Sequence, residues 1–232
     1  MKKLAFFHFT LMLSSISYSQ QTQLIKFSEK KQEYDYYGVK NSEGKVILPA
    51  KFLGLGIYDN YIIAGDAKNS MYYDNKGKLL ATYCDIKEFR YGVSIVRDCK
   101  TKDGFKGLIN KQGKVVLPPN KYTEIEDFTS YGLSLVSTNA YEKFGLIDTL
   151  GKTIAPCKYD AINLTAGVGD GLVPFQLDDK WGFMNIKGQE VIKAIYEDAD
   201  FFRNGKAKVS EMDKLTSKTR TFFIDTKGKE VN

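Results

Sequence analysis

Histidine is nearly absent from this sequence of 232 residues, in which His8 is the single example. His8 lies in an N-terminal segment that we predict to be removed, so the mature chain would contain no histidine. This excludes a Ser-His-Asp triad, a Cys-His pair and histidine-ligated zinc or haem. We therefore expect no catalytic residue, no metal site and no cofactor, and we predict that the protein is not an enzyme. Carboxylate pairs need no histidine, so that class of catalyst stays open.

Long apolar stretches are also scarce, and the N-terminal one, Leu4–Leu13, is too short to span a bilayer. Two lysines precede it and the small residues of Ser17–Ser19 follow it, as in a secretory signal peptide. We predict a signal peptide at residues 1–19 and a mature chain that begins at Gln20 and has no transmembrane segment. Such a chain is exported to the periplasm, the cell surface or the medium. An N-terminal membrane anchor is the alternative.

Proline is rare, with five residues, and no long stripe of apolar residues recurs every 3.6 positions, so helices are not expected as the main element. What recurs instead is a turn pattern, an Asp or Asn three residues before a glycine. The Asx side chain accepts backbone hydrogen bonds at the start of a type I turn, and the glycine takes the positive φ of a bulged hairpin. The six pairs are Asn41 and Gly44, Asp74 and Gly77, Asn110 and Gly113, Asp148 and Gly151, Asn185 and Gly188, and Asp225 and Gly228.

The spacing of these turn glycines predicts a tandem array. Successive glycines are 33, 36, 38, 37 and 40 residues apart, and a period in this range is typical of solenoids, propellers and other repeat arrays. One unit of this size cannot bury its apolar face alone, so each unit needs neighbours. Three residues after each glycine is an apolar position that we expect to face the core: Ile47, Leu80, Val116, Ile154, Val191 and Val231.

A second pattern follows most hairpins. A tyrosine is followed by an acid and an aliphatic residue, as in Tyr122-Thr123-Glu124-Ile125, and then by a strand that begins with glycine, as in Gly132–Val136. The two patterns together predict that each unit forms a four-stranded antiparallel meander. We expect residues 20–232 to form a single all-β domain of about six repeats. Closing these into a propeller-like ring would remove exposed sheet edges, and an open β-solenoid array is the alternative.

The pair Trp181-Gly182, followed by Phe183-Met184-Asn185, resembles the WG repeat of bacterial exported and surface proteins. Three other copies hold Tyr37-Gly38, Lys106-Gly107 and Phe144-Gly145 at this position, whereas the second and sixth hold Ser70-Met71 and Thr221-Phe222. The resemblance covers the chain from about Tyr36 to its C-terminus. It implies a β-rich repeat protein without an established enzymatic activity.

The repeat framework also predicts where binding would occur. The connections between the glycine-led strand and the Trp-Gly strand vary, and variable loops on a fixed scaffold usually carry binding residues. They should emerge on one side of a regular array. These loops are Arg97–Phe105, Thr138–Lys143, Asp178–Lys180 and Ser210–Thr219, with Phe105 and Tyr141 as aromatic residues. We expect an interaction scaffold for an unknown protein or glycan; the alternative is an envelope enzyme that acts on carbohydrate through a carboxylate pair.

Charge and glycine patterns argue against two other classes. The net charge is +6, but the lysines are spread over turns and loops without a dense run, so nucleic acid is not expected as a partner. Basic turns on one rim could touch acidic glycans or lipid headgroups, although solvated turns explain them as well. The segment Gly167–Gly171 lacks the flanking strand and helix of a phosphate-binding loop, and we predict a flexible insertion there.

Three cysteines, Cys84, Cys99 and Cys157, leave an odd number in an oxidising compartment. If the strands around the first two form a hairpin that turns at Tyr91-Gly92, residues whose numbers sum to about 183 lie opposite each other, as 84 and 99 do. Opposed residues of this kind are close enough for a disulfide. The geometry predicts a Cys84–Cys99 disulfide and a free Cys157. Three reduced thiols are the alternative, because a register shift of one residue moves a side chain to the other face.

Overall fold

The computed structural model describes residues 23–100, 104–139, 142–164, 168–213 and 217–231, which fold into six small antiparallel sheets. The strands are, sheet by sheet, β1 (Leu24–Lys31), β2 (Tyr34–Asn41) and β3 (Val46–Phe52); β4 (Gly54–Tyr58), β5 (Tyr61–Gly65), β6 (Ser70–Asp74) and β7 (Leu79–Tyr83); β8 (Asp85–Ile86), β9 (Val93–Arg97), β10 (Lys106–Asn110) and β11 (Val115–Tyr122); β12 (Glu124–Ile125), β13 (Leu133–Ser137), β14 (Phe144–Asp148) and β15 (Thr153–Tyr159); β16 (Ala161–Ile162), β17 (Leu172–Leu177), β18 (Lys180–Asn185) and β19 (Glu190–Tyr196); and β20 (Asp198–Ala199), β21 (Lys206–Met212), β22 (Thr219–Asp225) and β23 (Glu230–Val231). Within these ranges no helix has the length and apolar character of a membrane span. The predicted signal peptide, residues 1–19, lies outside the described residues.

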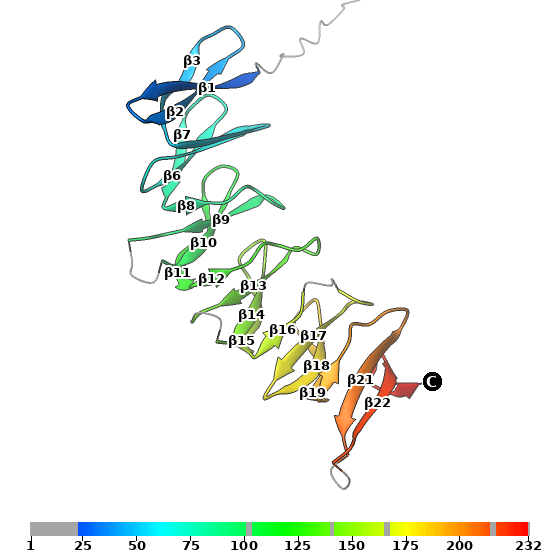
Figure 1. The fold of residues 1–232 in the computed structure, drawn as a ribbon. Coiled ribbons are helices and arrows are strands. Elements are labelled where there is room, and N and C mark those ends of the chain that lie inside the picture. The colour runs from blue at the N-terminus through cyan, green and yellow to red at the C-terminus, as the bar shows by residue number, and fades with distance from the viewer. Residues whose placement is uncertain (1–22, 101–103, 140–141, 165–167, 214–216, 232) are drawn as a thin grey trace, which may run out of the picture.

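The all-β prediction and the tandem meander are confirmed. Sheets two to six contain four strands each, hydrogen-bonded in chain order, and the first sheet contains three. The sheets resemble propeller blades, but they follow one another along an elongated, open array with the first and last sheets at opposite ends (Figure 1). Of the two arrangements considered from the sequence, this is the open one.

One boundary differs from the sequence-based expectation, because the Tyr-acid segment links two sheets and does not begin one. Tyr122 is the last residue of β11 and Glu124 is the first residue of β12. Tyr122 pairs across its own sheet with Lys106, at the start of the third strand. The tyrosines Tyr83, Tyr159 and Tyr196 end β7, β15 and β19 in the same way. The aromatic residue thus belongs to the preceding repeat and the acid to the next one.

Because the strand order is the same in each sheet, the connections gather at two opposite edges of the array. The loop edge contains the connections between second and third strands of the four-stranded sheets, which join β5 to β6, β9 to β10, β13 to β14, β17 to β18 and β21 to β22. The turn edge contains the six Asx-Gly turns and the turns between first and second strands.

The Asx-Gly turns share one set of hydrogen bonds. The Asn110 Oδ1 atom accepts the backbone N–H groups of Gln112 and Lys114, both at 3.0 Å. The other five turns have the same two bonds. All six turn glycines have φ between 74° and 85°, a region in which glycine has no steric penalty.

The apolar residues three positions after the turn glycines meet the core in four repeats, as expected. Ile47, Leu80, Val116 and Ile154 are half-buried and pack against the hydrophobic clusters, whereas Val191 is exposed. In the first five sheets the strand register shifts at this position. In β19, Glu190 lies opposite Met184 and Ile192 lies opposite Phe183, which leaves Val191 with no residue opposite it. A β-bulge of this kind leaves the extra residue outside the ladder and bends the strand. Val191 is 45% exposed, whereas Ile192 is 5% exposed and reaches the core. The other bulge residues are Ile47, Leu80, Val116 and Ile154.

The turn of the next repeat packs closely against the backbone at these bulges. A Cβ atom built on Gly188 would lie 2.0 Å from the Ile154 carbonyl oxygen of the preceding repeat. On Gly113 it would lie 2.9 Å from the Leu80 carbonyl oxygen. Glycine is therefore required for two reasons at Gly77, Gly113, Gly151 and Gly188: its backbone conformation and the close packing of the turn on the preceding repeat.

The glycine of the Trp-Gly pair accommodates a second irregularity. Opposite Gly145 the register shifts again between Phe144 and Leu146, because β15 contains extra residues there. This extra backbone folds over the glycine, and a Cβ atom on Gly145 would lie 2.6 Å from the Ala155 carbonyl oxygen. In the second sheet Met71 holds the glycine position, and there the strands pair without this shift. This copy can depart from Trp-Gly because its fourth strand, β7, lacks the extra residues opposite this position.

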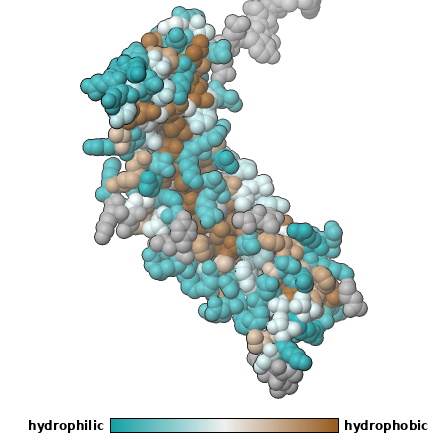
Figure 2. Space-filling view, in the orientation of Figure 1, coloured by the Kyte–Doolittle hydropathy of each residue, from teal (hydrophilic) through white to brown (hydrophobic). Residues whose placement is uncertain are grey.

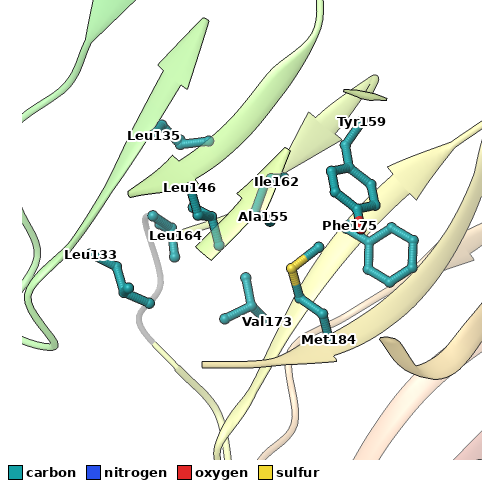
Figure 3. Close-up of a cluster of buried hydrophobic side chains, with 10 residues drawn as sticks. All are labelled: Leu133, Leu135, Leu146, Ala155, Tyr159, Ile162, Leu164, Val173, Phe175 and Met184. Carbon is teal, nitrogen blue, oxygen red and sulfur yellow. The ribbon is translucent and has the colours of Figure 1, made fainter. Parts of the chain in front are cut away.

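The core lies between successive sheets and not inside any one of them. Leucines on one face of the fourth sheet pack against the fifth sheet, as Figure 3 shows for Leu133, Leu135, Leu146, Val173, Phe175 and Met184. Inner sheets are buried on both faces, and Val93, Ser94, Ile95 and Val96 of β9 are all buried. In the space-filling view, hydrophobic residues form a band along the long axis of the array (Figure 2).

Candidate binding grooves at the loop edge

Two of the predicted binding loops line a groove between the third and fourth sheets. Arg97, Gly104 and Phe105, around the loop after β9, line it together with Thr138 and Asn139 from the loop after β13. The groove has a volume of about 550 Å³. The remaining lining residues are Asp85, Lys106, Thr123 and Glu124. We call this the loop-edge groove.

A second groove, of about 400 Å³, lies between the second and third sheets. Its lining consists of Lys68, Asn69, Thr82, Tyr83, Cys84, Asp98, Cys99 and Lys100. The loop after β9 contributes residues to both grooves. The position of this one loop therefore determines the shape of two neighbouring depressions.

A disulfide between Cys84 and Cys99 holds that loop, with 5.8 Å between the two Cα atoms. The hairpin turns at Tyr91-Gly92, as the sequence suggests, but Asp85 pairs with Arg97, one residue away from the register that we expected. The Cys84 N–H accordingly donates to the Arg97 carbonyl oxygen. The Cys157 thiol is half-buried and free, and burial raises its pKa.

Ion pairs between neighbouring repeats recur along the loop edge. Lys106 at the start of a third strand pairs with Glu124 at the start of the next sheet, and both side chains are mostly buried. Lys143 pairs with Asp160 and Lys180 with Glu197 in the same way. The sequence contains a signal for these pairs in its spacing, since the lysines precede their acids by 18, 17 and 17 residues.

The ammonium of Lys143 affects the acid that it contacts. Its hydrogen bond to Asp160 is the main reason that the pKa of this carboxyl lies below its ordinary value. The same bond raises the pKa of Lys143. At neutral pH the pair is therefore ionised, and Asp160 is poorly suited to act as a general acid.

The described residues contain no cluster of three or more His, Cys, Asp or Glu side chains that could hold a metal ion. Asp85 and Glu124 line the same groove, but Glu124 is engaged by Lys106. The groove is therefore lined by paired charges, hydroxyl groups, one amide and the half-buried ring of Phe105, a composition suited to recognition.

Other candidate residues are placed differently. Asp178 and Asp179 form a tight two-residue turn with φ of 51° and 61°, and Ser210 belongs to β21. Tyr141 lies outside the described residues. Gly169, in the segment predicted to be a flexible insertion, packs closely: a Cβ atom there would lie 2.1 Å from the Phe202 carbonyl oxygen.

Comparison with known proteins identifies the repeat. The model of the WG containing repeat matches residues 107–141, 144–181 and 181–214. No curated protein matches the sequence. Because three matches follow one another without a significant gap, residues 107–214 are built from WG containing repeats.

Solved structures give only remote similarities. PorZ, a surface component of the type-IX secretion system of Porphyromonas gingivalis, is 10% identical with a TM-score of 0.32, over 85% of this chain and 30% of PorZ. Virginiamycin B lyase from Staphylococcus aureus is 15% identical with a TM-score of 0.31, over 87% of this chain and 88% of the lyase. A protein of unknown function from Bacteroides caccae is 14% identical with a TM-score of 0.27, over 90% and 92%. Scores this low carry no functional information for this chain.

Proposed function

We propose that this chain, whose residues 107–214 are WG containing repeats, is a non-catalytic exported scaffold that binds a segment of a protein or a glycan in the loop-edge groove. The observation that carries the proposal is the groove itself. It is lined where the sequence departs from the repeat, at Phe105 and Asn139, while the surrounding framework keeps its period. Variable residues on a regular scaffold are where binding specificity is usually found.

Export is supported by two features. The N-terminal sequence has the basic and apolar regions of a signal peptide. The Cys84–Cys99 disulfide would persist in an oxidising compartment and would be reduced in most cytoplasms. We expect mass spectrometry of the mature protein to find a start near Gln20, and a full-length cytoplasmic product would contradict export.

The lining of the groove sets the chemistry of the ligand. Arg97 and Asp85 are exposed charges, Asn139 offers an amide, and Thr123 and Thr138 offer hydroxyl groups. Phe105 provides an apolar surface on which a sugar ring or an apolar side chain could pack. Such a lining suits an extended polar polymer better than a compact apolar molecule.

The test compares two double variants in affinity capture from envelope extracts and on a panel of purified glycans. Phe105→Ala with Asn139→Ala alters the groove, and Gln112→Ala with Thr226→Ala makes a comparable change at the turn edge. We expect the first variant to lose the captured ligand and the second to retain it. Equal capture by both variants would show that the groove is not the binding site.

A carbohydrate-active enzyme is the second candidate, because Asp85 and Glu124 line one groove. A glycosidase needs one carboxyl to donate a proton and the other to act as base or nucleophile. The pairing of Glu124 with Lys106, repeated in two further repeats, favours a structural role. Release of reducing ends from cell-wall polysaccharides by the purified protein, abolished by Asp85→Asn, would establish the enzyme instead.

A further inference from the structure

The Asx-Gly turns of the turn edge are basic, whereas the turns between first and second strands on the same edge are net acidic and include Asp59, Glu126 and Asp127. The six turn segments 41–45, 74–78, 110–114, 148–152, 185–189 and 225–229 contain nine lysines and four acids. These 30 residues therefore hold a net charge of +5 out of the +6 of the whole chain. Three of the four acids, the aspartates Asp74, Asp148 and Asp225, each accept two backbone hydrogen bonds within their turns. These three aspartates are thus engaged in the turns, while the lysines are exposed.

Exposed apolar side chains lie among these lysines. Leu150, in the fourth turn, is 77% exposed, more than any other large hydrophobic side chain in the described ranges. The equivalent position holds Lys76, Lys187 and Lys227 in three other turns. Ile186, in the next turn along the array, is 44% exposed. Turn geometry does not require an aliphatic residue at either position, since polar residues occupy both elsewhere.

An aromatic residue joins these aliphatic ones. Tyr131 is 53% exposed at the tip of the turn between β12 and β13. The glycine that follows it, Gly132, lies next to the fourth Asx-Gly turn, because a Cβ atom on Gly132 would lie 3.8 Å from the Thr149 Cγ2 atom. Tyr131 and Leu150 therefore project from two turns in contact, and Ile186 projects from the turn of the adjacent sheet. Exposed lysines Lys152 and Lys187 lie in the same turns.

We propose that the turn edge docks on the surface of an anionic phospholipid bilayer. The lysines would lie at the headgroups, where each contributes about 1 kcal/mol near an anionic surface. Tyr131, Leu150 and Ile186 would insert at the boundary between headgroups and acyl chains, as interfacial aromatic and aliphatic residues do. A soluble polyanion would account for the lysines but would give no contact to the side chain of Leu150. Docked in this way, the protein would present its opposite, loop edge to the surrounding medium.

The test is co-sedimentation of the mature protein with vesicles of phosphatidylcholine alone or of phosphatidylcholine mixed with phosphatidylglycerol. We expect binding to the anionic vesicles and a loss of binding as salt is raised. Lys114→Glu with Lys152→Glu should weaken binding about tenfold or more. The matched control is Lys51→Glu with Lys121→Glu, which has the same change in net charge near the loop-edge ends of β3 and β11. It should stay within about twofold of the unchanged protein, because those lysines lie away from the membrane.

The apolar tips are tested by Leu150→Ser with Ile186→Ser, against Leu53→Ser with Ile195→Ser as exposed aliphatic residues elsewhere. Only the first pair should weaken binding to anionic vesicles. Equal binding to neutral and anionic vesicles would overturn the proposal, as would equal effects of the two lysine pairs. Full displacement by soluble polyphosphate together with no effect of Leu150→Ser and Ile186→Ser would identify a polyanion site instead. Because none of these residues lines the loop-edge groove, the outcome is independent of the proposed scaffold function.

Discussion

The Asx-Gly turns of one edge and the loops after the second strands on the other differ in how closely they follow the repeat. At the turn edge all six Asx-Gly turns have the same length, the same pair of side-chain hydrogen bonds and the same glycine conformation. At the loop edge the connection between second and third strands varies from two residues after β17 to eight residues after β9. The disulfide lies at the loop edge as well.

Packing between repeats explains this difference. Each turn after the first rests on the preceding repeat, as Gly188 does on Ile154, so a longer or bulkier turn would separate two sheets. The loops after the second strands do not rest on the preceding repeat in this way. Their length and sequence can therefore change without displacing the sheets. The loops after the second strands can therefore acquire binding residues at a small cost in stability, whereas the Asx-Gly turns can change only side chains that are exposed to solvent.

The largest effect is expected where a turn is both strained and packed. Gly188→Val forces a β-branched residue to a φ of 76° and places its Cβ against the Ile154 carbonyl oxygen. Strain and overpacking together should cost on the order of 4 kcal/mol of unfolding free energy. Urea denaturation followed by circular dichroism measures the change.

Gly44 provides the matched control for this variant. It has a φ of 85° in the first turn, and no atom lies within 4 Å of the position that a Cβ would take. Gly44→Val therefore keeps the strain without the clash and should cost only about 1–3 kcal/mol. If the two variants are equally unstable, the turns do not pack on the preceding repeat as described.

The disulfide gives the next largest effect and acts at the loop edge. Cys84 and Cys99 are 15 residues apart, and removing a cross-link across a loop of this length costs about 3 kcal/mol. The double variant Cys84→Ser with Cys99→Ser should lower the urea midpoint by a corresponding amount. It should also weaken the binding of any ligand in the loop-edge groove. Cys157→Ser, at the free thiol, should leave both nearly unchanged. Equal effects of the two changes would mean that the disulfide does not hold the loop.

The fold was predictable from the sequence to the extent that local chemistry dictates it. Asx-Gly turns such as Asn110 to Gly113 specify hairpins without reference to the rest of the chain, and their period specifies the array. One detail that depends on contacts between repeats was predicted wrongly. The inward orientation of Val191 failed because its strand bulges beneath the next turn, a feature with no signature inside one repeat.

The candidate site was predictable only in part. The position of the loops follows from topology, so the loop edge could be located, but which loops face each other depends on their conformations. Asp178 and Asp179 form a tight turn, whereas Arg97 and Asn139 line one groove. The pair of Lys106 and Glu124 was accessible from the regular spacing of lysines and acids, yet each residue alone resembles an ordinary surface charge.

A smaller effect tests the role of the Trp-Gly glycine. Gly145→Ala places a Cβ atom 2.6 Å from the Ala155 carbonyl oxygen at a position without positive φ, so the cost arises from packing alone. We expect a loss of about 2 kcal/mol in unfolding free energy. Gly54→Ala, where no atom lies within 4 Å of the Cβ position, should change stability by less than about 0.5 kcal/mol. Tolerance of alanine at Gly145 would show that the extra backbone of β15 can move away.

The smallest expected effect compares one ion pair from each edge through its pH dependence. Lys143 lowers the pKa of Asp160 at the loop edge, and Lys87 lowers the pKa of Asp127 beside the turn edge. An acid whose pKa is lower in the folded protein than in the unfolded chain stabilises the fold above the unfolded pKa. This stabilisation is lost as the pH falls through the folded pKa. Asp160→Asn and Asp127→Asn should thus each reduce stability near neutral pH by less than about 1 kcal/mol, because all four side chains are partly exposed.

Asp160 should show the larger effect of the two, since its side chain is 27% exposed and that of Asp127 is 54% exposed. Urea midpoints of the variants and the unchanged protein, measured from neutral pH down to about pH 2, should converge at the acid end because both carboxylates are then protonated. Asp35→Asn, at an exposed carboxylate on β2, serves as the control for removal of a surface charge. A difference for Asp160→Asn that persists at the acid end would mean that the residue stabilises the loop edge through its shape and neutral hydrogen bonds and not through its ion pair with Lys143.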